Sequence, residues 1–173
     1  ISDQQSAGIP FFCWVHLMDA HTPYGRWPDH LEAIRGDTDV KHTTHPGAEG
    51  LVSQGSPPDD RAINTYDAAI RSADEEIGRL LDAVDDETIV VITGDHGEEF
   101  GRYENFHEAS TYSSFAQVPL FVRAPDMKIG TYEMPAQHLD IPPTLLSAIG
   151  ETPYKTWEGE PLQDTNRTEE TPI

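Results

Sequence analysis

The sequence predicts an α/β fold with a mixed, largely parallel β-sheet flanked by helices. Short apolar runs typical of buried strands alternate with stretches in which apolar residues recur every three or four positions, the spacing of an amphipathic helix. The predicted order is strand, helix, strand, strand, helix, without an internal repeat. With 173 residues, 36% of them hydrophobic, the chain is long enough for one core, so one domain or part of one is expected.

The first apolar run, IPFFCWVHLM at 9–18, is nearly continuous and aromatic, which suits a strand covered on both faces. The polar stretch that follows places Asp19 and His21 beyond the carboxyl end of this strand, where open α/β sheets bind ligands. Residues 29–60 are rich in Gly, Pro, Asp, Thr and His, and they are expected to form a surface excursion or lid.

Four further elements follow. Residues 61–84 carry apolar side chains at helical steps after the start signal SPPDD, and they predict the longest helix. TIVVIT at 88–93 predicts a buried strand with Gly-Asp-His-Gly at 94–97 as its tip. VPLFVR at 118–123 predicts another strand. Residues 141–149, with prolines near the start and a glycine just after the end, predict a short helix.

The charge of the chain limits its partners. A formal charge of −20, from 11 Lys+Arg against 31 Asp+Glu, argues against binding nucleic acid or an anionic membrane through a broad basic surface. The apolar runs favour a folded acidic surface over a disordered acidic segment. Such a surface suits concentrated salt, where the screening length falls to about 3 Å near 1 M. We therefore expect the protein to come from a high-salt organism. Both a cytoplasmic and an exported location stay open, as does the oligomeric state.

Cys13 is the single cysteine, so no disulfide framework and no cysteine-based metal site is expected. Within its apolar run it is expected to be a buried hydrophobe, and His16 in the same run is expected to be packed. No stretch approaches the roughly 20 apolar residues of a membrane span. The chain begins without Met and ends in a polar tail at 163–173, so both ends are expected to be cut from something larger.

The clearest chemical signal is Asp95 with His96, bracketed by glycines that let the backbone approach a ligand closely. A carboxylate oxygen and an imidazole nitrogen both bind divalent ions. Two donors cannot complete a coordination shell, because zinc takes about four and hard cations six or more. Further ligands must therefore come from elsewhere. Taken alone, the tetrapeptide is equally compatible with a tight turn whose aspartate caps backbone groups.

Five runs together resemble the sulfatase family of the alkaline-phosphatase superfamily in order and spacing. VVITGDHGEEFG is similar to the metal-binding segment of that family, HLMDAHTPY to its strand and His-x-Pro loop, and YDAAIRSADEEIGRLLDAV to the helix before the metal strand. VPLFVRAP resembles its Arg-Val-Pro strand, and QHLDIPPTLLSAIG its late segment with a histidine and an aspartate before a Pro-Thr helix. The resemblance implies a partial sulfatase-like catalytic domain over 1–173, with an incomplete alkaline-phosphatase-like fold.

Site roles follow from the resemblance. It implies that Asp95 and His96 are metal ligands, that His21 contacts the substrate anion, and that His107 binds the transferred group and assists the leaving oxygen. His21 and His107 are thus the expected catalytic and substrate-binding residues, with a solvated loop histidine as the plain alternative for each. Oxygen-rich sites favour calcium, while His96 keeps manganese, magnesium and zinc open. The implied substrate is a small-molecule or carbohydrate sulfate ester.

Other polar residues have plainer explanations. His138 and Asp140 match the His-x-Asp pair of the family, but an inward histidine bonded to an aspartate that only orders the core is favoured. Asp19 is expected to contact the metal network or to fix its loop, and Asp74 to pack or cap. The histidines of the excursion are expected to be solvent-exposed: His30, His42 and His45.

The chain also departs from the family pattern. Family members carry a Cys or Ser in a Cys/Ser-x-Pro-x-Arg motif, where conversion to formylglycine creates the nucleophile, and they carry two further metal aspartates upstream. Nothing in the 173 residues fits that motif. Half of a site, inactive alone, is therefore expected. The histidine after Asp95 keeps a phosphodiesterase, phosphonate monoester hydrolase or phosphoethanolamine transferase of the superfamily open, and a non-catalytic scaffold is a further alternative.

Overall fold

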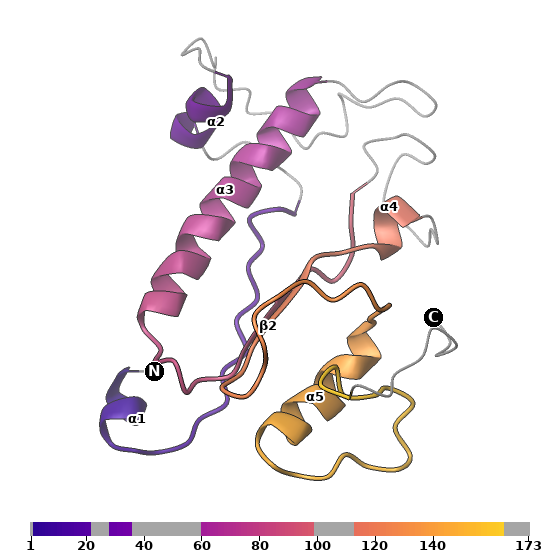
Figure 1. The fold of residues 1–173 in the computed structure, drawn as a ribbon. Helices are drawn as coiled ribbons and strands as arrows, with labels where there is room; N and C mark the ends of the chain where they lie inside the picture. The colour runs from indigo at the N-terminus through magenta and orange to yellow at the C-terminus, as the bar shows by residue number, and fades with distance from the viewer. Residues whose placement is uncertain (1, 22–27, 36–59, 99–112, 165–173) are drawn as a thin grey trace. The chain divides into compact units, whose positions relative to one another are not determined.

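The computed structural model of the chain describes residues 2–21, 28–35, 60–98 and 113–164 (Figure 1). The chain divides into two compact units. The first comprises Ile1–Asp85 and Gly94–Pro119, and the second comprises Asp86–Thr93 and Leu120–Ile173.

Several predicted features lie outside the described residues. They include most of the excursion and most of the polar tail, so the lid stays a prediction. The features concerned are residues 36–59 and 165–173, His42, His45 and His107.

The longest element of the first unit is α3 (Asp60–Asp82), which confirms the helix predicted at 61–84. Its small residues Ala68, Ala69 and Ser72 are almost fully buried, at 1%, 0% and 4% exposure. The helix ends where the Ala83 N–H donates to the Leu80 carbonyl oxygen at 3.1 Å. Within the described residues, no helix combines the length and apolar character needed to cross a membrane.

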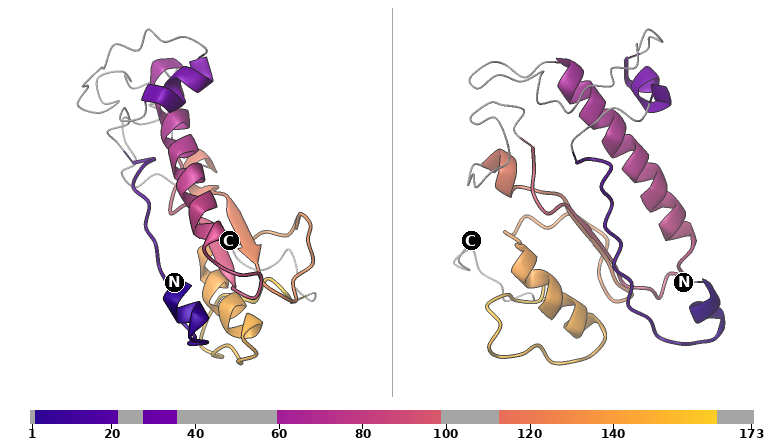
Figure 2. Two further views of the ribbon diagram at one scale, coloured as in Figure 1. Left: turned by 90° about the vertical axis from the view of Figure 1, so that its left-hand side faces the viewer. Right: turned by 180° about the vertical axis from the view of Figure 1, so that it is seen from behind.

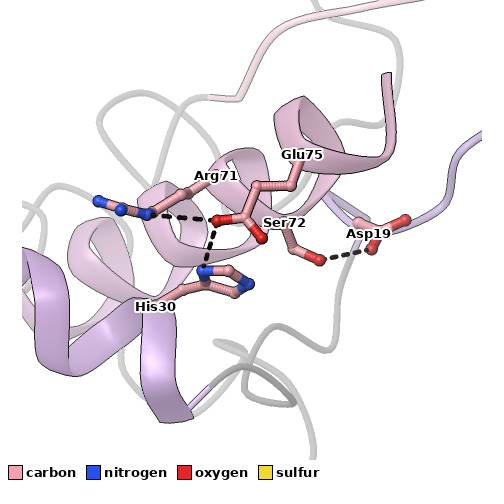
Figure 3. Close-up of polar contacts among 5 residues, drawn as sticks. All are labelled: Asp19, His30, Arg71, Ser72 and Glu75. Carbon is pink, nitrogen blue, oxygen red and sulfur yellow. Dashed lines mark hydrogen bonds and ion pairs between the residues drawn. The ribbon is translucent and has the colours of Figure 1, made fainter. Parts of the chain in front are cut away.

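A shorter helix, α2 (Pro28–Arg35), packs against α3. Its His30 Nδ1 lies 3.6 Å from Glu75 Oε1, and the Nε atom of Arg71 lies 3.9 Å from the same oxygen (Figure 3). The expectation of a solvent-exposed His30 is wrong, since its side chain is only 20% exposed. The reason is tertiary, because the packing of α2 against α3 turns this histidine toward Glu75.

The apolar run at 9–18 follows the short helix α1 (Ser2–Ser6) but contains no strand. A strand needs a hydrogen-bonded neighbour, and none of the described residues pairs with this run. The side chains of Phe12 and Trp14 are accordingly 81% and 79% exposed. The expectations of a buried Cys13 and a packed His16 are wrong for the same reason, since both are exposed.

The second unit contains β1 (Val90–Thr93) and β2 (Leu120–Arg123), which confirm the two strands predicted late in the chain. They pair antiparallel, with Val90 opposite Arg123 and Thr93 opposite Leu120 (Figure 2). These two strands form the sheet that the described residues contain. A mixed sheet includes antiparallel pairs, and the largely parallel arrangement stays a prediction.

Helix α5 (Ile141–Ala148) confirms the last predicted helix. Prolines occupy its first turn, where their missing N–H groups have no intrahelical partner in any case. Gly150 ends it with φ of 79°, a left-handed conformation that favours glycine, and the Glu151 N–H donates to the Leu146 carbonyl oxygen at 2.9 Å.

The 3₁₀ turn η2 (His138–Asp140) precedes α5, and the side chain of Asp140 in it is fully buried. Its Oδ2 accepts the Gln137 N–H and its Oδ1 accepts the Glu160 N–H, both at 2.9 Å. The predicted core-ordering role of Asp140 therefore agrees with its contacts. The expected inward histidine is wrong, because His138 is exposed, with its Nε2 atom 3.3 Å from Thr93 Oγ1.

Thr144 continues this hydrogen-bonded core. Its hydroxyl donates to the Asp140 carbonyl oxygen at 2.6 Å and accepts the Leu162 N–H at 2.9 Å. At Gly159 the backbone lies so close to the Leu139 carbonyl that a side chain would overlap it. The segment around 159–162 is thus fastened to η2 and the first turn of α5.

Candidate functional site

Asp95 and His96 follow β1 directly in the chain and lie in the first unit. The His96 N–H donates to Asp95 Oδ1 at 3.0 Å, which orients the carboxylate. The Asp95 side chain is 75% exposed and that of His96 35%, so both are accessible to a ligand.

The hydrogen bond of the His96 ring determines which nitrogen can bind a metal. Its Nδ1 lies 2.9 Å from the Gly97 carbonyl oxygen. A carbonyl oxygen only accepts, so Nδ1 carries the proton and the neutral ring has its lone pair on Nε2. That Nε2 lies 3.9 Å from Asp95 Oδ2. Typical metal–ligand distances of about 2.0–2.4 Å allow one ion to contact two atoms this far apart, so the pair fits a divalent metal.

The ring of His96 is held by α4 (Ser113–Ala116). It stacks on buried Phe115 with centroids 4.9 Å apart and an interplanar angle of 4°. The Gly97 N–H donates to the Phe115 carbonyl oxygen at 2.7 Å. Stacking and hydrogen bonding together fix the rotation of the ring and so direct its second nitrogen.

The surroundings of Asp95 keep its carboxyl ionised. Burial raises its pKa, but hydrogen bonds from the N–H groups of Asp95 and His96 and the nearby imidazoles of His96 and His16 outweigh burial, so the pKa lies below its usual value. The negative charge that binds a cation therefore persists in neutral and mildly acidic solution and is lost only as the pH falls through the lowered pKa.

A charge at the end of this loop affects the pKa of Tyr66 on α3. Burial raises the pKa of Tyr66, and the negative charges of Glu98 and Asp67 raise it further. Glu98 lies two residues beyond His96, so the loop runs close enough to α3 for its charge to act on a tyrosine there.

The other predicted site residues that the structure describes lie outside the Asp95–His96 loop. His21 is exposed, and its N–H donates to the Met18 carbonyl oxygen at 3.2 Å in a turn. Asp19, in the same turn, accepts a hydrogen bond from Ser72 of α3 (Figure 3). Asp74 is exposed on α3. Among the residues that the structure describes, no three His, Cys, Asp or Glu side chains gather as a metal cluster. The roles of His21 and His107 therefore stay predictions.

Sequence reasoning did not anticipate Phe115 or Ser72. Phe115 lies in a run without strong periodicity, and a buried serine at a helical position gives no signal of its own. The glycine at 97 was the available hint, since its backbone touches that of Ser114 and Phe115.

Gly97→Ala is expected to disturb the site by displacing the loop from α4. A methyl group there would overlap the Ser114 carbonyl oxygen, and such overpacking costs about 1–3 kcal/mol. Thermal unfolding and calcium titration of the full-length gene product measure the effect. Gly78→Ala is the matched control, because Gly78 faces open space on α3 and alanine there favours the helix by about 0.5–1 kcal/mol. Equal stability and metal affinity in both variants would contradict the close packing.

Known proteins resemble this chain in sequence. The sulfatase family model matches residues 1–151. A sulfatase of Formosa agariphila is 32% identical over 108 residues, which are 59% of this chain and 21% of that protein. A choline-sulfatase of Rhizobium meliloti is 30% identical over 95 residues, 52% of this chain and 19% of that protein.

A 2,3-bisphosphoglycerate-independent phosphoglycerate mutase of Natronomonas pharaonis is 37% identical over 139 residues, 78% of this chain and 25% of that protein. The chain thus spans about a fifth to a quarter of the length of these relatives. The family match includes the Asp95–His96 loop and brings with it the α/β fold of the alkaline-phosphatase superfamily. This chain belongs to the sulfatase family.

Proposed function

We propose that the chain is the metal-binding part of a sulfuric ester hydrolase that depends on a divalent metal. The Asp95–His96 pair carries this proposal. The carboxylate of Asp95 is ionised, and its Oδ2 lies 3.9 Å from the His96 Nε2, which carries a lone pair. The pair lies in the segment that matches the sulfatase family. Calcium is the preferred ion, with manganese, magnesium and zinc as alternatives.

The proposed roles of the site residues follow from the negative charge that develops during ester cleavage. Asp95 and His96 would hold a divalent ion, which when bound would stabilise negative charge on a sulfate oxygen. His21 and His107 donate hydrogen bonds to the anion. His107 also gives a proton to the ester oxygen as it leaves. Each such donor is worth about a hundredfold or more in rate.

The nucleophile of the proposed reaction is a formylglycine hydrate formed in a Cys/Ser-x-Pro-x-Arg motif, which these 173 residues do not contain. The hydrate oxygen attacks sulfur, the bond from sulfur to the ester oxygen breaks, and the alcohol leaves with a proton. The 173-residue chain alone is therefore expected to be inactive.

Phosphoryl transfer is the second candidate. The relative named as a phosphoglycerate mutase aligns with more of this chain than either sulfatase named above. The same donor pair would stabilise a phosphate ester, since both anions are tetrahedral and carry negative charge on their nonbridging oxygens. A nucleophile other than formylglycine would accompany that chemistry.

The full-length gene product that contains this segment provides the test. After removal of metal with EDTA, it is assayed with an aryl sulfate, an aryl phosphate and a bis-aryl phosphate, with and without added calcium or manganese. We expect metal-dependent hydrolysis, fastest on the sulfate. Preference for a phosphate ester would replace the proposal with the second candidate. Tight metal binding without turnover of any ester would indicate a non-catalytic scaffold.

A further inference from the structure

A side-chain hydrogen bond connects the turn that carries His21 to α3. Ser72 Oγ donates to Asp19 Oδ1 at 3.3 Å, across 53 positions of sequence (Figure 3). This distance is longer than the usual range of about 2.5–3.0 Å for an O–H···O bond, so the link is weak. The His21 N–H closes the same turn on the Met18 carbonyl oxygen.

Ser72 is well placed to act as a fixed anchor. It is only 4% exposed and lies in the middle of the 23-residue helix α3, beside the buried Ala68 and Ala69. A helical serine can instead donate to the carbonyl four residues earlier in its own helix. Here its hydroxyl reaches out of the helix to Asp19, so the position of the turn is coupled to a rigid element.

The same helix also approaches the second loop of the site. The charge of Glu98, two residues after His96, acts on Tyr66 of α3. The turn with His21 is thus hydrogen-bonded to α3, and the charge of Glu98, at the end of the loop with Asp95 and His96, acts on the same helix within the first unit.

We propose that the Ser72–Asp19 hydrogen bond positions His21 and that Ser72 is a positioning residue of the site. The role of His21 as the anion contact rests on the proposed function, whereas the anchoring of its turn does not. Loss of the bond loosens the turn and shifts the His21 imidazole away from the anion. A displacement of about 1 Å can lower the rate up to a hundredfold, and the weakness of this bond leads us to expect a smaller loss of about tenfold.

The experiment compares Ser72→Ala, Asp19→Ala, their double variant and Asp19→Asn in the full-length gene product. Asp19→Asn keeps a carbonyl oxygen that accepts the serine hydroxyl, so it serves as the conservative rescue. Ser147→Ala is the matched control, because it removes a hydroxyl from α5 in the second unit. Hydrogen exchange of the His21 amide reports on the turn, and kcat and KM for an aryl sulfate report on the site.

We expect His21 exchange to be about tenfold faster in Ser72→Ala and Asp19→Ala, with kcat/KM about tenfold lower, while Asp19→Asn and Ser147→Ala resemble wild type. The double variant is expected to be no worse than either single variant, because both remove the same bond. Unchanged His21 exchange in Ser72→Ala, or additive losses in the double variant, would overturn the proposal. If wild type hydrolyses no ester, the proposed function fails, and the exchange measurements alone still decide the anchoring.

Discussion

Asp95→Ala is expected to reduce ester hydrolysis by the full-length gene product at least about a hundredfold and to weaken its affinity for divalent metal. The variant removes the carboxylate that accepts the His96 N–H and leaves one imidazole nitrogen of the donor pair. Calcium titration by calorimetry measures the affinity, and kcat/KM on the best ester measures the rate.

The control for Asp95→Ala is Asp126→Ala, which removes the same charge from an exposed position in the second unit. It distinguishes the loss of a ligand from the small change in a net charge of −20. The pH dependence adds a further check. Because the pKa of Asp95 is lowered, its contribution to metal binding should remain intact in mildly acidic solution and disappear only as the pH falls through that lowered pKa. Turnover by Asp95→Ala near that of wild type would refute the site assignment.

Asp140→Ala is expected to lower the free energy of unfolding by about 3–6 kcal/mol, since the fully buried carboxylate accepts two backbone N–H groups and a hydrogen bond to a charged group contributes about 1.5–3 kcal/mol. Those donors are the N–H groups of Gln137 and Glu160. Denaturant unfolding of the full-length gene product measures the loss. Hydrogen exchange at the Glu160 amide identifies where the structure opens.

Asp140→Asn sharpens this prediction. It keeps the size of the side chain but turns one of two accepting oxygens into an amide donor that faces a backbone N–H. We expect it to be destabilising as well, whereas Asp126→Asn makes the same chemical change at an exposed site and should shift stability by less than about 0.5 kcal/mol. Stability of both Asp140 variants within that margin would show that the buried network is dispensable.

Asp95 and Asp140 look similar in the sequence, but the structure distinguishes their roles. Both aspartates fall in segments that resemble the sulfatase family, and each has a histidine within two positions in the sequence. Asp95 is 75% exposed, whereas Asp140 is fully buried with both oxygens accepting backbone N–H groups. Exposure and hydrogen-bond partners therefore separate a candidate ligand from a structural residue.

Local signals in the sequence were sufficient to predict two helices and two strands. The helical spacing of apolar residues placed α3 and α5, and β-branched apolar runs placed β1 and β2, each within a few residues of its observed ends. The same kind of signal failed at 9–18, where an apolar run predicted a strand. Periodicity reports which side chains prefer burial, but it contains no information on whether a neighbouring strand supplies hydrogen bonds.

The sequence by itself determined the main helices and strands of this protein and the Asp95–His96 motif, because these depend on residues close together in the chain. Only the tertiary structure decided the ring orientation of His96 against Phe115, the link from Ser72 to Asp19 and the burial of Asp140. These features depend on contacts between residues about 20 to 53 positions apart. Packing selects such contacts, and no local pattern of residue types encodes them.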